Sequence, residues 1–256
     1  MTEFGTELDR VMSASWLQKA GLIALLGLAL VTTAHADMPG SELTRLNDDA
    51  DDTYTSPDGQ IVIEQYWRKK AEYDRVWEFW AFDAKHEHGV LLNPGEDTNI
   101  AGYPAGFRFS PNSQWVVRMQ KIGSGSQTLL LYRRNGFDFS PATPKPLGEM
   151  AWDFFYSQPI SRKIHRMPKD RHSLNHAQVN LLQGVDDNYA SEGRTWPDSR
   201  YLLLSLSFDA QGEDHKLPWI EDWQIVFDIK TDKFWIPADL ADNNADAINY
   251  PEPKRK

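Results

Sequence analysis

The chain has 256 residues, a formal net charge of −10 and no cysteine. The lack of cysteine excludes disulfides, thiolate metal ligands and cysteine nucleophiles. An acidic chain lacks the basic surface that displaces counterions from nucleic acid, and anionic membranes repel it. We therefore expect neither a nucleic-acid-binding protein nor one that adsorbs to membranes.

Residues 1–36 are typical of an export signal. Gly21–Val31 is a run of eleven apolar residues that follows a lysine and precedes Ala34-His35-Ala36. Such a run is shorter than the roughly 20 residues that span a bilayer, and small residues at alternate positions are typical of a cleavage site. We predict a signal peptide over 1–36, cleavage before Asp37, and a periplasmic or secreted protein without a membrane anchor.

The start and the remaining boundaries are also predicted from composition. Residues 1–11 carry three acidic side chains, which is atypical of the start of a signal peptide, so we expect translation to begin at Met12. After the signal we expect an acidic flexible arm at 37–55, a β repeat domain at 56–240 and a C-terminal tail at 241–256. About 220 residues are enough for one domain with a sizeable core.

Three similar turns, each followed by a β-rich run, divide the predicted domain. They are SPDGQIVIEQYW from Ser56, SPNSQWVVRMQK from Ser110 and WPDSRYLLLSLS from Trp196. A recurring unit of turn and strand predicts a repetitive all-β fold. The expected strands, in chain order, are Ile61–Trp67, Val76–Asp83, Val90–Leu92, Trp115–Lys121, Thr128–Arg133, Gly136–Phe139, Tyr201–Phe208, Trp223–Ile229 and Phe234–Ile236.

The spacing of the turns predicts the number of units. Their prolines are 54 and 86 residues apart, whereas one propeller blade takes about 40 to 50 residues. The longer gap therefore predicts a degenerate fourth unit, with a strand at Trp152–Ser157, and Ala177–Leu182 entering the next blade. We expect a small or incomplete β-propeller of antiparallel meanders, and a β-sandwich is the alternative.

The pattern of SPDG followed by a strand resembles the repeat of bacterial periplasmic propellers of the Tol translocation system. This resemblance implies a periplasmic fold that is used mainly for protein binding. It carries over no catalytic residue.

Aromatic residues are dense in the expected strand at Val76–Asp83. Alternation along the strand puts Trp77, Phe79 and Ala81 on one face, and Trp80 and Phe82 on the other. Rings on both faces predict a strand buried on both sides by packing between blades; the alternative is a ring face open to a partner or a glycan.

A basic segment, Ser161–His176, stands out in this acidic chain. A cationic loop attracts an acidic partner, because arginine offers planar bidentate donors to carboxylates. The alternative is a solvated insertion between blades. The predicted partner-binding residues are Arg162, Lys163, Arg166, Lys169 and Arg171.

Other motifs give little support for catalysis or for a metal. His172 and His176 have the i, i+4 spacing of some zinc sites, and His86 and His88 lie in one hairpin, but no HExxH motif completes either pair. No nucleophile elbow is present, and Gly123–Ser126 reads as a hairpin turn. We predict no metal, no cofactor and no catalytic residue. The acidic residues that a hydrolase could use are Asp153, Asp186, Asp187, Glu192, Glu221 and Asp222.

Three functions from different classes fit these patterns. The first is a periplasmic protein-binding module without catalytic activity, for example an inhibitor or immunity protein against a secreted toxin that targets the envelope. The second is a propeller hydrolase that acts on envelope glycans or phosphoesters. The third is a structural component of the cell envelope. The lack of a catalytic motif and the basic segment favour the first.

Overall fold

The computed structural model describes residues 38–46, 54–72, 74–92, 102–123, 125–163, 177–182, 199–208 and 219–249. The predicted signal peptide and the third proline turn up to residue 198 lie outside these residues. The strands are β1 Thr44–Arg45, β2 Tyr54–Thr55, β3 Ile61–Lys69, β4 Arg75–Asp83, β5 Gly89–Leu91, β6 Ala105–Phe109, β7 Trp115–Gly123, β8 Ser126–Asn135, β9 Asp138–Pro141, β10 Ala177–Leu181, β11 Tyr201–Phe208, β12 Trp219–Asp228, β13 Lys233–Trp235 and β14 Ile248–Asn249. The helices are α1 Leu147–Ser157, the 3-10 helix η3 Pro159–Lys163 and α3 Ala238–Asp246.

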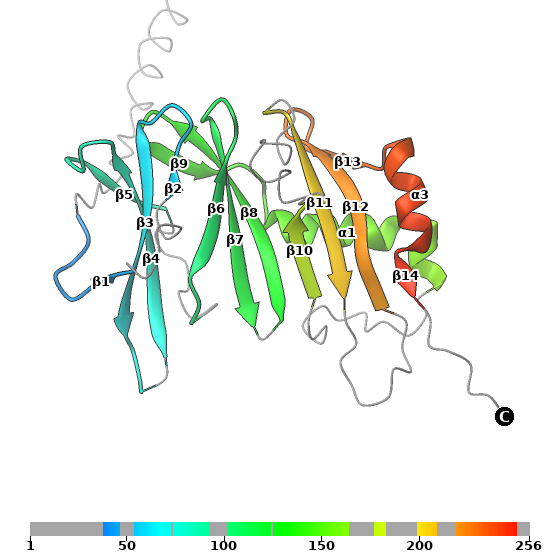
Figure 1. Ribbon diagram of the computed structural model, residues 1–256, viewed down its shortest axis with the longest axis horizontal. Helices are drawn as coiled ribbons and strands as arrows, with labels where there is room; N and C mark the ends of the chain where they lie inside the picture. The colour runs from blue at the N-terminus through cyan, green and yellow to red at the C-terminus, as the bar shows by residue number, and fades with distance from the viewer. Residues whose placement is uncertain are drawn as a thin grey trace, which may run out of the picture. The chain divides into compact units, whose positions relative to one another are not determined.

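Twelve of the fourteen strands that the structure describes form three units of four, and each unit is an antiparallel meander (Figure 1). The first unit is β2-β3-β4-β5, the second is β6-β7-β8-β9 and the third is β10-β11-β12-β13. Within a unit, each strand pairs with the next one along the chain, and the second and third units belong to one nine-stranded sheet. The predicted all-β class, with a propeller-like repeat of antiparallel meanders, is confirmed.

The turns that open the first and second units have the same internal hydrogen bonds. The hydroxyl of Ser56 accepts the N–H of Ile61 at 2.9 Å and donates to Asp58 at 2.6 Å. The hydroxyl of Ser110 likewise accepts the N–H of Trp115 at 3.0 Å and donates to Asn112 at 2.7 Å. Each serine therefore closes its turn and starts the following strand.

A left-handed residue recurs at the fourth position of all three turns. The φ angles of Gly59, Ser113 and Ser199 are 68°, 59° and 62°. This conformation costs glycine nothing and costs serine some strain. In Ser113 and Ser199 the side chain compensates with a hydrogen bond to the preceding turn, which a glycine could not make.

Those hydrogen bonds join the three turns in sequence order. The N–H of Asp58 donates to the hydroxyl of Ser113 at 3.0 Å, and the N–H of Asn112 donates to that of Ser199 at 3.1 Å. Among the described residues, then, no unit lies between the second and the third. The predicted degenerate unit is wrong.

Helix α1 occupies the sequence in which that unit was expected. Its buried residues Leu147, Ala151 and Phe155 recur every four positions, which is the period of a helix face and not of a strand. The strand expected at Trp152–Ser157 is therefore helical, because packing of this face outweighs the β propensity of its aromatic residues. The expectation that Ala177–Leu182 enters the next unit is confirmed, since it contains β10.

Two core clusters hold the units together. Phe79 of the first unit packs edge-on against Phe107 of the second at 5.5 Å, and the guanidinium of Arg118 lies 4.2 Å from the Phe79 ring. Trp77 and Phe79 on one face of β4 and Trp80 and Phe82 on the other are all buried. The prediction of a strand buried on both sides is confirmed. The larger cluster joins α1 to the second and third units.

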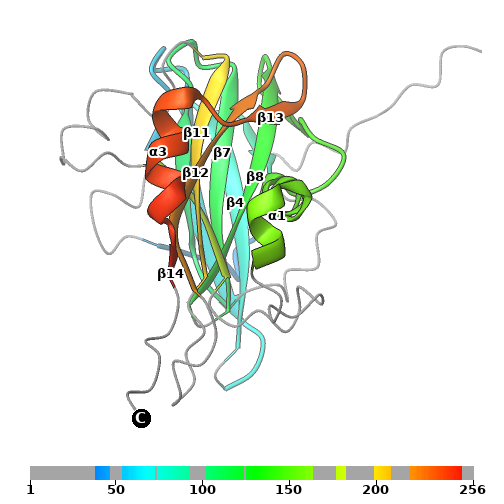
Figure 2. The ribbon, with the colours of Figure 1, turned by 90° about the vertical axis from the view of Figure 1, so that its right-hand side faces the viewer.

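The outer edge of β12 is closed along most of its length. β13 pairs with one end of the edge and β14 with the other. Between them, the side-chain amide of Asn244 in α3 accepts the N–H of Gln224 at 2.6 Å and donates to its carbonyl at 2.7 Å. Figure 2 shows α3 and α1 on two sides of the strands. Asn244 thus replaces a paired strand and protects this edge.

Regular structure extends beyond the expected domain boundaries on both sides. β1 and β2, within the segment assigned to the acidic arm, pair with β3. α3 continues past residue 240, and β14 pairs with β12. Among the described residues, no helix is long and apolar enough to cross a membrane.

Arg200 fastens the third turn to the hairpin that follows β12. Its guanidinium donates two hydrogen bonds to Asp228, at 2.9 and 2.7 Å. These bonds hold the pKa of the Asp228 carboxyl well below its ordinary value. A carboxyl with a lowered pKa in the folded state stabilises the fold above its unfolded pKa near 4, and this contribution is lost as the pH falls further.

Replacing Asp228 tests this linkage. We expect Asp228→Asn to unfold at lower urea than wild type at pH 7, and the difference to shrink as the pH is lowered from 5 towards 2. Urea unfolding followed by tryptophan fluorescence at each pH measures it. Asp138→Asn, at an exposed aspartate, serves as the control. A difference that stays constant with pH would contradict the assignment.

Candidate binding site

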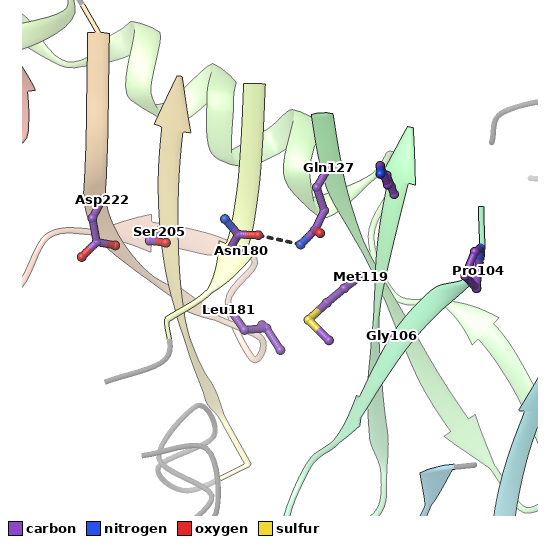
Figure 3. A pocket seen from close by; sticks show the side chains of 9 residues that line it. Pro104, Gly106, Met119, Gln127, Asn180, Leu181, Ser205 and Asp222 are labelled. Carbon is purple, nitrogen blue, oxygen red and sulfur yellow. Dashed lines mark hydrogen bonds between the residues drawn. The ribbon is translucent and has the colours of Figure 1, made fainter. Parts of the chain in front are cut away.

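A trough lies on one face of the nine-stranded sheet, which contains β6 to β14. Its volume is about 510 Å³. The lining residues lie on β6, β7, β8, β10, β11 and β12, which are neighbours in the sheet, and Pro104 lies directly before β6 (Figure 3). They are Pro104, Gly106, Met119, Lys121, Gln127, Asn180, Leu181, Ser205 and Asp222. This volume is in the usual range for sites that bind small ligands or short segments of a partner.

Side-chain amides cross the middle of the trough, where the second unit meets the third. β8 and β10 run parallel there and share one register pair, Gln127 with Gln178. The amide of Gln127 donates to Asn180 at 2.6 Å, Asn180 donates to Gln178 at 3.3 Å, and Gln178 donates to the carbonyl of Gly125 at 2.9 Å. These amides reinforce a junction that has little backbone pairing.

The apolar part of the lining depends on a glycine. A Cβ on Gly106 would lie 2.7 Å from the terminal methyl group of Met119, so the glycine leaves room for this side chain. Leu181 and Pro104 complete the apolar part. Methionine is flexible and polarisable, and it adapts to ligands of different shape.

Two opposite charges lie at the two sides of the trough. The ammonium group of Lys121 on β7 lies 4.4 Å from the ring centre of Tyr103. The carboxylate of Asp222 on β12 accepts a hydrogen bond from the Gln224 side chain at 2.7 Å, and its backbone is left-handed, with a φ of 55°. Both residues are exposed, and neither makes an ion pair with a residue that the structure describes.

The lining residues include few groups used in hydrolysis. Of the nine that lie in the described part of the chain, one is a carboxylate and none is a histidine. A glycosidase needs two carboxylates across its cleft, which these residues do not provide. Asp222 is the member of the predicted acidic set that lies here. Glu221 is exposed next to it, Asp153 pairs with Lys145, and Asp186, Asp187 and Glu192 lie outside the described residues.

The predicted partner-binding residues fall mostly outside the described part of the chain. Arg162 is exposed in η3, directly after α1, and Lys163 is the last residue of η3. Arg166, Lys169 and Arg171 lie outside the described residues, as do His172 and His176. The structure thus places the start of the basic segment at the surface and does not bring Arg162 into the trough.

The hairpin histidines have separate partners. His88 bonds Asp83 at 2.9 Å, and the ligand atoms of Asp83, Glu87 and His88 lie within 4.8 Å of one another. The same Asp83 carboxylate accepts the N–H groups of Lys85 and Glu87. The hydrogen bond with His88 and these two backbone hydrogen bonds hold the pKa of the Asp83 carboxyl below its ordinary value. Its oxygens are therefore engaged in shaping the hairpin.

A buried carboxylate, Glu64, was not singled out by the sequence. Its side chain is 3% exposed and bonds Arg45 at 2.5 Å, His86 at 3.0 Å and the Tyr66 hydroxyl at 2.8 Å. Burial and the Glu64 carboxylate raise the pKa of Tyr66 to about 12. Three donors satisfy Glu64, so it joins β1 and the β4–β5 hairpin to β3. The sequence feature that could have indicated a buried carboxylate is the single charged residue in the run IVIEQYW.

Comparisons with known proteins give matches only among solved structures. No family model and no curated protein matches the chain. It is similar to the AtxE2 isopeptidase at 12% identity and a TM-score of 0.39, over 83% of this chain and 32% of that one. It is also similar to TolB from Acinetobacter baumannii at 13% identity and a TM-score of 0.31, over 75% of this chain and 33% of that one. A putative TolB from Agrobacterium tumefaciens matches at 14% identity and a TM-score of 0.30, over 72% of this chain and 48% of that one. The chain thus spans a third to a half of each of these structures.

Removing the central amide tests the junction between the second and third units. We expect Gln127→Ala to accelerate backbone hydrogen exchange in β10 and to leave β3 and β4 unchanged, because the lost hydrogen bond fastens β10 locally. A net loss of about 0.5–1.5 kcal/mol is typical of one hydrogen bond. Gln60→Ala, at an exposed turn, is the control. Unchanged exchange in β10 would show that the backbone pairing alone holds the junction.

Proposed function

We propose that the protein is an exported binding module of the cell envelope, and that it recognises another protein without transforming it. The trough is the observation that carries this proposal. It is open and neutral through its middle, and it offers amide and hydroxyl groups beside adaptable apolar ones. Such a surface suits a segment of another protein, which presents both backbone amides and apolar side chains.

A second contact is proposed at the basic segment. Arg162 is exposed, and the following basic residues are Lys163, Arg166, Lys169 and Arg171. In a chain with a net charge of −10, a local cationic segment favours an acidic partner and speeds the encounter with it. One form of this proposal is an inhibitor that protects the envelope from a secreted toxin.

Export is tested at the predicted cleavage site. We expect Ala34→Phe to block processing, because the cleavage site requires small residues at alternate positions, whereas His35→Phe at the intervening position should be processed normally. N-terminal sequencing of protein from the periplasmic fraction measures this, and the wild type should begin at Asp37. A different N-terminus, or equal processing of both variants, would contradict the assignment.

Partner binding is tested by capture from the organism's own envelope and secreted fractions with the tagged full chain. We expect one stoichiometric protein partner, identified by mass spectrometry. Arg162→Glu combined with Lys163→Glu should weaken the retention of this partner and make the retention depend less on salt concentration. The reason is that charges at the edge of an interface act mainly through long-range attraction. The matched control is Arg108→Glu with Lys230→Glu, which reverses the charges of two exposed residues outside this segment.

The outcomes separate binding from catalysis. A captured protein that leaves intact when eluted supports the binding module. Release of products from purified envelope glycan by the wild-type protein, with no protein partner retained, would overturn the proposal in favour of a hydrolase. If both double variants retain the partner equally, the basic segment is not part of the contact, and the trough remains the proposed binding surface.

A further inference from the structure

We propose that the trough binds an extended peptide segment of about six residues. The segment runs across the strands, with an acidic side chain at the Lys121 end and a basic side chain at the Asp222 end. This inference rests on the proposed function and specifies the chemistry of the partner. It follows from the dimensions, the unused hydrogen-bonding groups and the charges of the trough.

The length of the segment follows from the strand order. From β7, which carries Lys121, to β12, which carries Asp222, the sheet order passes through β8, β10 and β11. Each step between neighbouring strands is about 4.8 Å, so the two charged residues are separated by about 19 Å along the sheet. An extended chain advances about 3.3–3.6 Å per residue and needs about six residues to reach both.

Unused hydrogen-bonding groups lie between the two charges. The hydroxyl of Ser205, which is 6% exposed, makes no hydrogen bond with a residue that the structure describes. Gln127 donates one of its two N–H groups to Asn180, and its carbonyl oxygen accepts none from the described residues; Asn180 likewise donates one N–H. The middle of the trough therefore offers both donors and acceptors without net charge. A peptide backbone, which carries one donor and one acceptor per residue, matches this set.

Other ligand classes match less well. The nine lining residues that the structure describes include no aromatic ring on which a sugar could stack. One of these described residues is a cation, whereas phosphate groups are usually bound by several donors or by arginine forks. A peptide with opposite charges at its ends uses both Lys121 and Asp222, which the other two classes do not.

The charges of the trough predict which peptides bind. The probes are capped hexapeptides: Glu-Ala-Ser-Thr-Ala-Lys and its reverse, Lys-Ala-Thr-Ser-Ala-Glu, because the backbone direction is open, and a neutral peptide with glutamine at both ends. Titration calorimetry with the full chain measures the dissociation constants. We expect one of the two charged peptides to bind about five- to tenfold more tightly than the neutral one, as two partly exposed ion pairs allow.

A charge swap tests the assignment of the Lys121 end. Lys121→Glu should lose the preference for Glu-Ala-Ser-Thr-Ala-Lys or its reverse, and it should gain affinity for a hexapeptide with lysine at both ends. Asp222→Asn should reduce the preference by removing one charge while keeping a residue that tolerates the left-handed backbone. Lys230→Glu, at an exposed lysine outside the lining, should leave all peptide affinities unchanged.

The results distinguish this inference from the proposed function. No binding of any hexapeptide at millimolar concentration, or equal binding of charged and neutral peptides, overturns the peptide inference. If the envelope partner is still captured by Lys121→Glu as by wild type, the protein binds its partner through another surface and the proposed function stands. If no partner is captured either, both proposals fail.

Discussion

The hydrogen bonds between successive turns are the constraint on which the rest of the structure depends. Asp58 bonds Ser113 and Asn112 bonds Ser199, so the three units meet in sequence order at one end. This order places the first strand of the third unit, β10, directly beside β8. At this junction two meanders join into one sheet through a single register pair. Side chains rather than backbone hydrogen bonds therefore complete the junction, and these side chains line the trough.

How much could be predicted from the sequence differs between turns, helix and trough. The turns could be recognised because their short polar motifs act locally: Ser56 and Ser110 bond within their own turns. Helix α1 was missed because its aromatic residues favour strands, and only the four-residue spacing of Leu147, Ala151 and Phe155 reveals the helix face.

The trough could not be predicted because its residues meet through long-range pairing. Gln127 and Asn180 are 53 positions apart and bond across a parallel junction that no local pattern indicates. Asp222 was a candidate carboxylate for hydrolysis, and among the described lining residues of the trough it is the one carboxylate. Which residues face one another across a sheet is decided by register, and register is a property of the assembled units.

The closed edge of β12 is consistent with the proposal that a partner binds the face of the sheet rather than this edge. An open edge would add a strand from any chain with free backbone groups, with little dependence on sequence. Asn244, β13 and β14 occupy that edge, so the proposed recognition uses side chains in the trough. Side chains discriminate by charge and shape, and Lys121 and Asp222 give the two sides of the trough opposite charges.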